Sequence, residues 1–308
     1  MAIRITSNMV SNQTLSNLNK NKNTMSDLSM QSSTGRRINK PSDDPVGTTY
    51  ALRYRAELAS TDQYKTNTDA AKSWLDNSDT LMQQSTDIMK RVKELVIQAG
   101  TGTTDASGLK AIKDELSQLK GQMADIGNSQ LTGRYVFNGE KFDQRPYQLD
   151  ASTPSYASVV TDPGKVTYGI SEQISIGVST SGNEFFGKPA DTDNAFAIFD
   201  RLGSAIDNIT ATGSRDYSPL TNELKNIESR TTTMGAVRSE VGAKTNRVEL
   251  VNSRLEDREM NITSLQSKVE DADIAEVMIK ATTAQTLYQA ALQTSAATMK
   301  LSLVNFLS

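Results

Sequence analysis

The sequence predicts a mainly α-helical protein with a small β-rich insertion, in which both chain ends contribute to an elongated, rod-like helical bundle or coiled coil. Three observations support this fold class. Apolar residues recur at heptad spacing in both halves of the chain, four of the seven prolines lie between residues 134 and 190, and only 6% of the 308 residues are aromatic. A seam between helices buries apolar side chains without a large spherical core, so it suits this composition.

Two helices are expected in the first half of the chain. One apolar stripe repeats every seven residues and is doubled at the next position, so it is wide enough to contact two partner helices. It consists of Trp74, Leu75, Leu81, Met82, Ile88, Met89, Leu95 and Val96. A second stripe, from Leu109 to Ile126, alternates steps of three and four, and a glycine-rich loop over residues 100–108 separates the two stripes. We expect an antiparallel helix pair.

The second half of the chain contains the most regular heptad pattern. Six apolar residues recur at intervals of seven: Met234, Val241, Val248, Leu255, Ile262 and Val269. A second row, formed by Val237, Val251 and Leu265, is interrupted by Lys244 and Arg258, whose stems can be buried while their charges reach water. This pattern predicts one long helix with a coiled-coil seam.

Residues 134–190 differ in character from the rest of the chain. Prolines break any helix there, and apolar residues alternate from Val166 to Val178 as they do in half-buried strands. We therefore expect a small β-rich outer domain over residues 134–190. A short amphipathic helix from Phe196 to Ile209 then returns the chain to the bundle, so residues 45–133 and 191–270 form the helical rod.

The chain ends, residues 1–44 and 271–308, are expected to pair as assembly helices. Their apolar residues are widely spaced among polar ones, so the ends bury too little surface to offset the entropy lost on ordering them. We hypothesise that both ends are largely disordered in the free monomer and fold against each other and against neighbouring subunits. The predicted assembly interface comprises Ile3, Ile5, Val10, Leu18, Met25, Leu28, Tyr288, Leu292, Met299, Leu303 and Phe306.

Composition argues against several classes of function. The chain has no cysteine and no histidine, which removes disulfides, thiolate metal sites and the commonest catalytic base. Its 33 basic and 36 acidic residues give no field that would attract nucleic acid. No apolar run reaches about 18 residues, and the first residues lack the pattern of a cleaved signal peptide. We expect no cofactor, no metal, no nucleic-acid partner, no membrane insertion and no enzymatic activity.

Two acidic motifs are the main candidates for chemistry. Adjacent carboxylates at residues 43 and 44 could support acid–base chemistry or hold a cation, but Ser or Asp before a proline is typical of a helix cap. We interpret this motif as a rigid corner between two helices, formed by Pro41, Ser42, Asp43, Asp44 and Pro45. A second acidic cluster is interpreted as a solvated charge patch or a subunit contact; it contains Glu270, Asp271, Asp273 and Glu276.

Both chain ends resemble a known family. Residues 28–49, LSMQSSTGRRINKPSDDPVGTT, are similar to the N-terminal signature of the flagellin superfamily, and residues 269–308 resemble its C-terminal region. The resemblance covers roughly the first 140 and the last 80 residues. It implies a structural protein of the bacterial flagellum that is exported unfolded, without a cleaved signal peptide, and assembles outside the cell through its terminal helices.

Within the superfamily, the prolines of the corner make the chain more similar to proteins of the hook–filament junction than to flagellins, which usually lack them. This resemblance implies an adapter between hook and filament. The implied partners are neighbouring copies in a ring, the adjacent hook-associated junction protein, flagellin, and an export chaperone on the C-terminal helix. Three alternatives stay open: a flagellin that builds the filament, an intracellular coiled-coil scaffold, and a carboxylate-based enzyme that uses Asp43 and Asp44.

Overall fold

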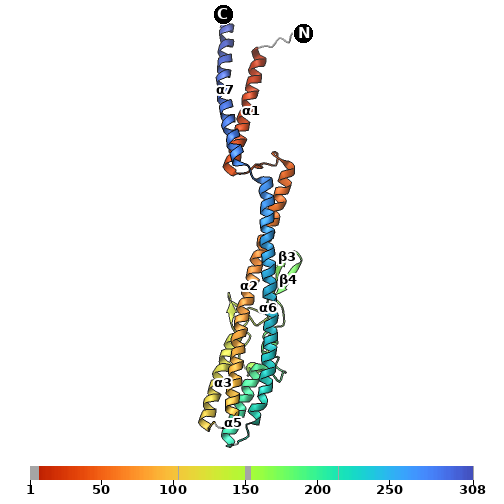
Figure 1. The fold of residues 1–308 in the computed structure, drawn as a ribbon, viewed down its shortest axis with the longest axis vertical. Helices are drawn as coiled ribbons and strands as arrows, with labels where there is room; N and C mark the ends of the chain where they lie inside the picture. The colour runs from red at the N-terminus through yellow and green to blue at the C-terminus, as the bar shows by residue number, and fades with distance from the viewer. Residues whose placement is uncertain (1–6, 103, 150–153, 214, 308) are drawn as a thin grey trace. The chain divides into compact units, whose positions relative to one another are not determined.

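The computed structural model describes residues 7–102, 104–149, 154–213 and 215–307 (Figure 1). The chain divides into two compact units, which we call the terminal unit (residues 1–60 and 257–308) and the central unit (residues 61–256). In chain order the elements are α1 (Ser7–Thr34), α2 (Pro45–Gly100), α3 (Ala106–Gly127), β1 (Gln130–Leu131), β2 (Arg134–Tyr135), the 3₁₀ turn η1 (Tyr156–Ser158), β3 (Thr167–Ser171), β4 (Ile174–Gly177), α4 (Gly182–Phe186), α5 (Ala195–Thr212), α6 (Ser218–Glu270) and α7 (Ile274–Leu307).

The central unit is a helical bundle built from α2, α3, α5 and α6. The doubled stripe of α2 is buried at every position except Leu81, which is half-buried. Helices α3 and α5 contact each other, and each buries apolar residues spaced by three and four. Ion pairs of 2.6 Å between Arg238 and Asp79 and of 2.7 Å between Lys72 and Glu249 join α6 to an antiparallel α2. The predicted helices and their buried faces are therefore confirmed.

The heptad seam of α6 is buried along most of its length. Residues Met234 to Ile262 of the period-seven row are all buried, as are Val237 and Val251 of the second row. The two charged interruptions reach outward to partners: Lys244 pairs with Glu240 and Arg258 pairs with Glu57 on α2. The prediction for Leu265 is wrong, because its side chain is 43% exposed. The second row of the seam therefore does not extend to the end of α6.

The middle segment contains little regular strand. Strands β3 and β4 form an antiparallel pair in which Tyr168 faces Ile176, and β1 pairs with β2. The segment is held to the bundle by a cluster of aromatic rings whose neighbouring centroids lie 5.0–5.8 Å apart: Phe137, Tyr147, Phe185, Phe186 and Phe196. The prediction of a mainly helical protein with a small sheet-containing middle is confirmed, although turns and irregular segments outnumber strand residues in the described part of residues 134–190.

In the terminal unit, α1 and α7 lie side by side and contact each other, as Figure 1 shows. Their neighbours in the same unit are the first turns of α2 and the last turns of α6. None of the helices in the described part of the chain is both long and apolar enough to cross a membrane.

Candidate assembly site: the terminal helix pair and the paired turns

The terminal helix pair, α1 with α7, meets along one narrow stripe on each helix. On α7 the buried and half-buried residues are spaced by four and three: Val277, Ala281, Ala284, Tyr288, Ala291 and Ser295. On α1 five half-buried residues follow the same spacing: Thr14, Leu18, Asn21, Met25 and Leu28; Met30 and Gln31 near the end of the helix are half-buried as well. This spacing keeps one face of each helix toward its partner. Four of the eleven side chains with this spacing are alanine or serine, so the stripe contains little apolar volume.

The predicted interface residues fall into three groups. Leu18, Met25, Leu28 and Tyr288 lie half-buried on the stripe. Leu292 lies off the stripe and is exposed, because after Tyr288 the contact face continues through Ala291 and Ser295 instead. Ile3 and Ile5 lie outside the described residues, as do the side chains of Val10, Met299, Leu303 and Phe306. Among the described side chains of α1 and α7, only Val277 and Ser295 are buried, at 6% and 8% exposure.

Two turns connect the helices of the terminal unit, and they are bonded to each other. We call residues 35–44, between α1 and α2, and residues 271–273, between α6 and α7, the paired turns. Arg36 and Asp271 form an antiparallel bridge: the Arg37 amide donates to the Glu270 carbonyl at 2.6 Å, and the Ala272 amide donates to the Gly35 carbonyl at 3.0 Å. The turn that follows α1 and the turn that precedes α7 are therefore held together by these backbone hydrogen bonds.

The corner motif supplies two carboxylates with separate structural tasks. Asp44 caps α2 through a 2.8 Å hydrogen bond from the Gly47 amide to its Oδ1, with Pro45 as the first helical residue. Asp43 instead accepts hydrogen bonds at its Oδ2 from the amides of Asn39 and Lys40, at 3.1 and 2.8 Å. These amides lower the pKa of Asp43, and the Gly47 amide lowers the pKa of Asp44.

Pro41 and Ser42 are exposed between these contacts, and Pro45 begins α2. Both carboxylates at the corner are occupied by backbone amides, and Asp44 also lies 3.2 Å from the Arg37 guanidinium. A carboxylate engaged in this way holds the chain in a fixed turn and is poorly placed to transfer a proton. The arrangement therefore favours a structural corner.

The acidic cluster at the end of α6 differs from its prediction as a solvated patch. The Glu270 residue is only 1% exposed, with its carboxylate 2.7 Å from Arg55 Nε and 3.9 Å from Arg36 Nε. Gln266 donates a 3.0 Å hydrogen bond to the other carboxylate oxygen. Burial raises the pKa of Glu270, but the contacts with Arg55 and Gln266 together lower it by more, so the net shift of the pKa is downward. Glu270 is thus a buried anchor of the paired turns.

The other acidic residues of the cluster are exposed and locally bonded. Asp273 caps α7 through hydrogen bonds from the amides of Ala275 and Glu276, at 3.0 and 3.2 Å. Asp271 accepts a 2.5 Å hydrogen bond from the hydroxyl of Ser267. Within the described ranges, no group of three or more acidic side chains is arranged to hold a metal ion.

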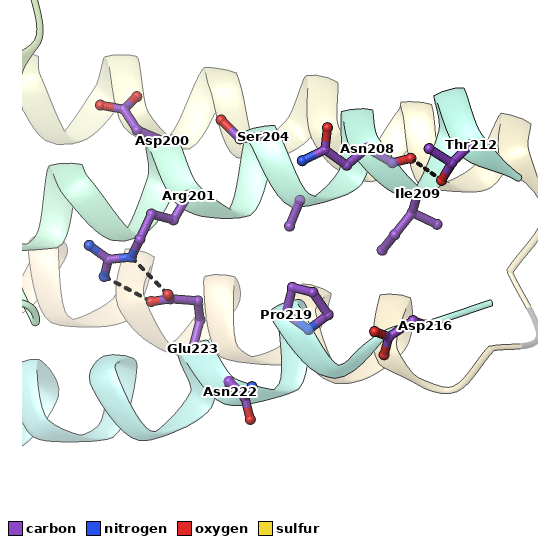
Figure 2. Close-up of a pocket in the computed structure, with 11 residues that line it drawn as sticks. Asp200, Arg201, Ser204, Asn208, Ile209, Thr212, Asp216, Pro219, Asn222 and Glu223 are labelled. Carbon is purple, nitrogen blue, oxygen red and sulfur yellow. Dashed lines mark hydrogen bonds and ion pairs between the residues drawn. The ribbon is translucent and has the colours of Figure 1, made fainter. Parts of the chain in front are cut away.

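A separate cavity of about 590 Å³ lies between α5 and α6 in the central unit (Figure 2). Its size is that of a small-molecule site. Figure 2 shows Arg201 and Glu223 pointing toward each other, joined by two hydrogen bonds of 2.7 and 2.8 Å. Glu223 raises the pKa of Arg201. Asp200 and Asp216 are bonded to Ser155 and to the Ser218 amide. The charged lining groups are already paired with one another or with neighbouring residues, so we do not assign a reaction to this cavity.

Two family models match the chain. The model of the bacterial flagellin N-terminal helical region matches residues 5–142, and the model of the bacterial flagellin C-terminal helical region matches residues 224–307. Together they span most of the chain and include the terminal helix pair and the paired turns. The chain belongs to the flagellin family.

Relatives of this flagellin-family chain carry two kinds of name. A flagellin from Bacillus subtilis is 28% identical over 296 residues, which cover 94% of this chain and 93% of that protein. Flagellar hook-associated protein 3 from Salmonella typhimurium is 24% identical over 316 residues, covering 95% of each.

Solved structures share the fold. Flagellar hook-associated protein 3 from Legionella pneumophila superposes with a TM-score of 0.63 at 14% identity, over 71% of this chain and 98% of that one. The flagellar junction protein FlgL from Legionella pneumophila superposes with a TM-score of 0.57 at 15% identity, over 72% of this chain and 100% of that one.

Sequence reasoning missed the basic half of the site. Arg36, Arg37 and Arg55 contact Glu270, the Val269 carbonyl or Asp44, and so connect segments far apart in the chain. The sequence does contain a signal for this contact. Two arginines lie a few residues before the corner in the N-terminal region, and an acidic stretch lies in the C-terminal region, so the two ends carry opposite charges that could pair.

Proposed function

We propose that this protein is a non-enzymatic structural subunit of the bacterial flagellum that joins the hook to the filament. The observation that carries the proposal is the corner from Pro41 to Pro45, which is locked by Asp43, Asp44 and the paired turns. These prolines are the feature by which the sequence resembles junction proteins more than flagellins. A near-full-length relative named hook-associated protein 3 supports the same assignment.

Assembly is proposed to take place through the terminal helix pair. With only Val277 and Ser295 buried among the described side chains of α1 and α7, the pair gains little from apolar burial within one chain. Exposed apolar residues remain on α7, among them Met278, Ile279 and Leu292. Burying these residues against neighbouring subunits would stabilise the helices and the assembly together.

The proposed partners follow from this role. They are neighbouring copies in a ring, the adjacent hook-associated junction protein, flagellin, and an export chaperone that covers the C-terminal apolar residues before assembly. Export of the unfolded chain without a cleaved signal peptide and a final position outside the cell belong to the same proposal. The absence of cysteine from the sequence is compatible with passage between reducing and oxidising compartments.

A second candidate function is supported by the Bacillus subtilis relative, which is named a flagellin and matches over 93% of its length. In that case the chain would build the filament itself. The two candidates predict different amounts and positions of the protein in isolated flagella.

A deletion strain and a labelled variant test the proposal. We expect the deletion strain to build hooks and to release flagellin into the medium, whereas loss of the main filament protein would support the second candidate. Val160 is 75% exposed and the chain has no cysteine, so Val160→Cys provides a single labelling site. Gold label in electron micrographs should mark one short zone at the base of each filament. Label along the whole filament would contradict the junction assignment.

A further inference from the structure

We propose that neighbouring copies of this chain contact each other through two apolar surfaces on opposite sides of α2, next to the paired turns. This inference rests on the proposed ring and names the residues that close it. One surface, the corner pocket, is a cavity of about 210 Å³ whose lining includes Ile38, Lys40, Thr48, Ala51, Leu52, Arg55 and Glu270. The other, the apolar flank, consists of Val46, Tyr50 and Leu265.

The corner pocket has the character of a protein contact. Its volume lies below the roughly 300–1,000 Å³ of small-molecule sites, so it suits one or two side chains. Ile38, Ala51 and Leu52 supply apolar walls. Two cationic groups lie beside them: the Arg55 guanidinium, which is paired with Glu270, and the exposed Lys40 ammonium, 3.9 Å from Asp27. A side chain with an apolar, electron-rich ring fits this combination, because the ring can contact aliphatic groups and attract a cation.

The apolar flank contains such a side chain. Tyr50 is 49% exposed and Val46 is 67% exposed, and both lie in the first two turns of α2. One face of the Tyr50 ring stacks on Tyr54, with the ring centroids 6.4 Å apart. The register of the two antiparallel helices places Leu265 next to Tyr50. Glu57 and Arg258 form a 2.6 Å ion pair between α2 and α6. Glu57 lies one heptad after Tyr50 on α2, and Arg258 lies one heptad before Leu265 on α6. Because the two helices are antiparallel, both steps run in the same direction, so Tyr50 and Leu265 lie at the same level as each other. The three residues therefore form one patch.

The two surfaces lie at the same height on opposite sides of α2. At about 100° per residue, Val46 and Tyr50 are roughly 100° to 180° around the helix from Thr48, Ala51, Leu52 and Arg55. Their positions interleave between residues 46 and 55, so neither surface is displaced along the helix axis. Two different surfaces at one height generate a heterologous contact that closes into a ring when copies are related by rotation about an axis parallel to α2. The occupant of the corner pocket is thus Tyr50 of a second copy.

Disulfide crosslinking in isolated flagella tests this contact. The variant with Val46→Cys and Leu52→Cys carries one thiol on each surface, and the chain has no other cysteine. The two thiols of one copy face away from each other across α2, so they cannot bridge within the chain. After oxidation we expect a ladder of crosslinked multimers on a non-reducing gel, while each single-thiol variant stays monomeric. Absence of the ladder, or dimers from a single-thiol variant, would overturn the proposal.

A matched pair of charge substitutions provides the second readout. Tyr50→Asp places a charge at the proposed contact, whereas Met260→Asp places one at an exposed apolar residue of α6 that belongs to neither surface. Loss of a central aromatic anchor should weaken the contact by roughly thirtyfold or more. Cells with Tyr50→Asp should therefore carry few filaments and cells with Met260→Asp a normal number. Equal counts in the two strains would refute the contact. Failure of the junction assignment itself is recognised separately, because the Val160→Cys label would then not lie at the filament base.

Discussion

Replacement of Arg55 by methionine should loosen the paired turns more than replacement of its partner Glu270 by glutamine. Arg55→Met leaves a carboxylate that is 1% exposed with only Gln266 in hydrogen-bond contact and Arg36 at 3.9 Å. Removing one partner of a buried pair typically costs about 3–5 kcal/mol. Because the Arg55 side chain is 43% exposed, solvent already screens this pair, and we expect about 2 kcal/mol.

Glu270→Gln should cost less, about 1 kcal/mol, because the arginines that it leaves behind are half-exposed and can be hydrated. The double variant should be more stable than Arg55→Met alone, since it contains no unpaired buried charge. Native-state amide exchange measures the effect at Arg37 and Ala272, whose amides bond the two turns to each other. A loss of about 2 kcal/mol accelerates their exchange about thirtyfold.

The pH dependence of the same amides provides a second test. The folded-state pKa of Glu270 is lowered, so its contribution is fully present above the ordinary glutamate pKa and is lost as pH falls through the folded value. Exchange corrected for its intrinsic rate should therefore accelerate only in acid, and this step should become smaller in Glu270→Gln. The remaining step comes from Asp43 and Asp44, whose pKa values are also lowered. Arg53→Met, at an exposed arginine two residues away, serves as the control. Unchanged exchange in Arg55→Met, or a larger effect in Glu270→Gln, would refute the reasoning.

Three further substitutions test other contacts. Gly35 has a φ of +70°, so Gly35→Ala should destabilise the paired turns by about 1–2 kcal/mol, measured by Ala272 exchange; no change there would show that the left-handed turn is not required. Asp44→Ala removes the α2 cap and should cost about 1 kcal/mol, seen as faster exchange at Gly47; unaltered protection would contradict the cap. Buried Arg230 pairs with Asp193 at 2.5 Å, so Arg230→Met should lower the free energy of unfolding by about 3 kcal/mol, measured by urea denaturation followed by Trp74 emission; a loss under about 1 kcal/mol would argue against this anchor.

The helical part of the fold could be predicted because its signal is local and repeated. Residues such as Met82, Met89 and Val248 recur at helical spacing, and the helices bury them on the expected faces. The aromatic cluster could not be predicted in this way. Phe137 and Phe185 are nearly fifty residues apart, in segments without regular periodicity, so only the folded chain brings their rings within 5.8 Å.

The candidate site was predictable in part for the same reason. The corner from Pro41 to Pro45 follows from local backbone chemistry, and the structure adds which amides each carboxylate accepts. Glu270 looked like part of a solvated patch because its partners, Arg36 and Arg55, come from the other end of the chain. Leu265 was expected to be buried because it continues the heptad pattern. That pattern does not report how many partner helices are present, and Leu265 is exposed in the structure.

Amide exchange on dilute monomer tests most directly whether the terminal helices depend on other subunits. The measurement compares residues 14–28 and 281–295 with the buried stripe of α2 between Trp74 and Val96 in the same sample. We expect the terminal helices to exchange with opening free energies near zero and the α2 stripe to exchange only by global unfolding. Protection of the terminal helices equal to that of the α2 stripe in the solitary monomer would contradict assembly-dependent folding and remove the reason for calling this protein a building block.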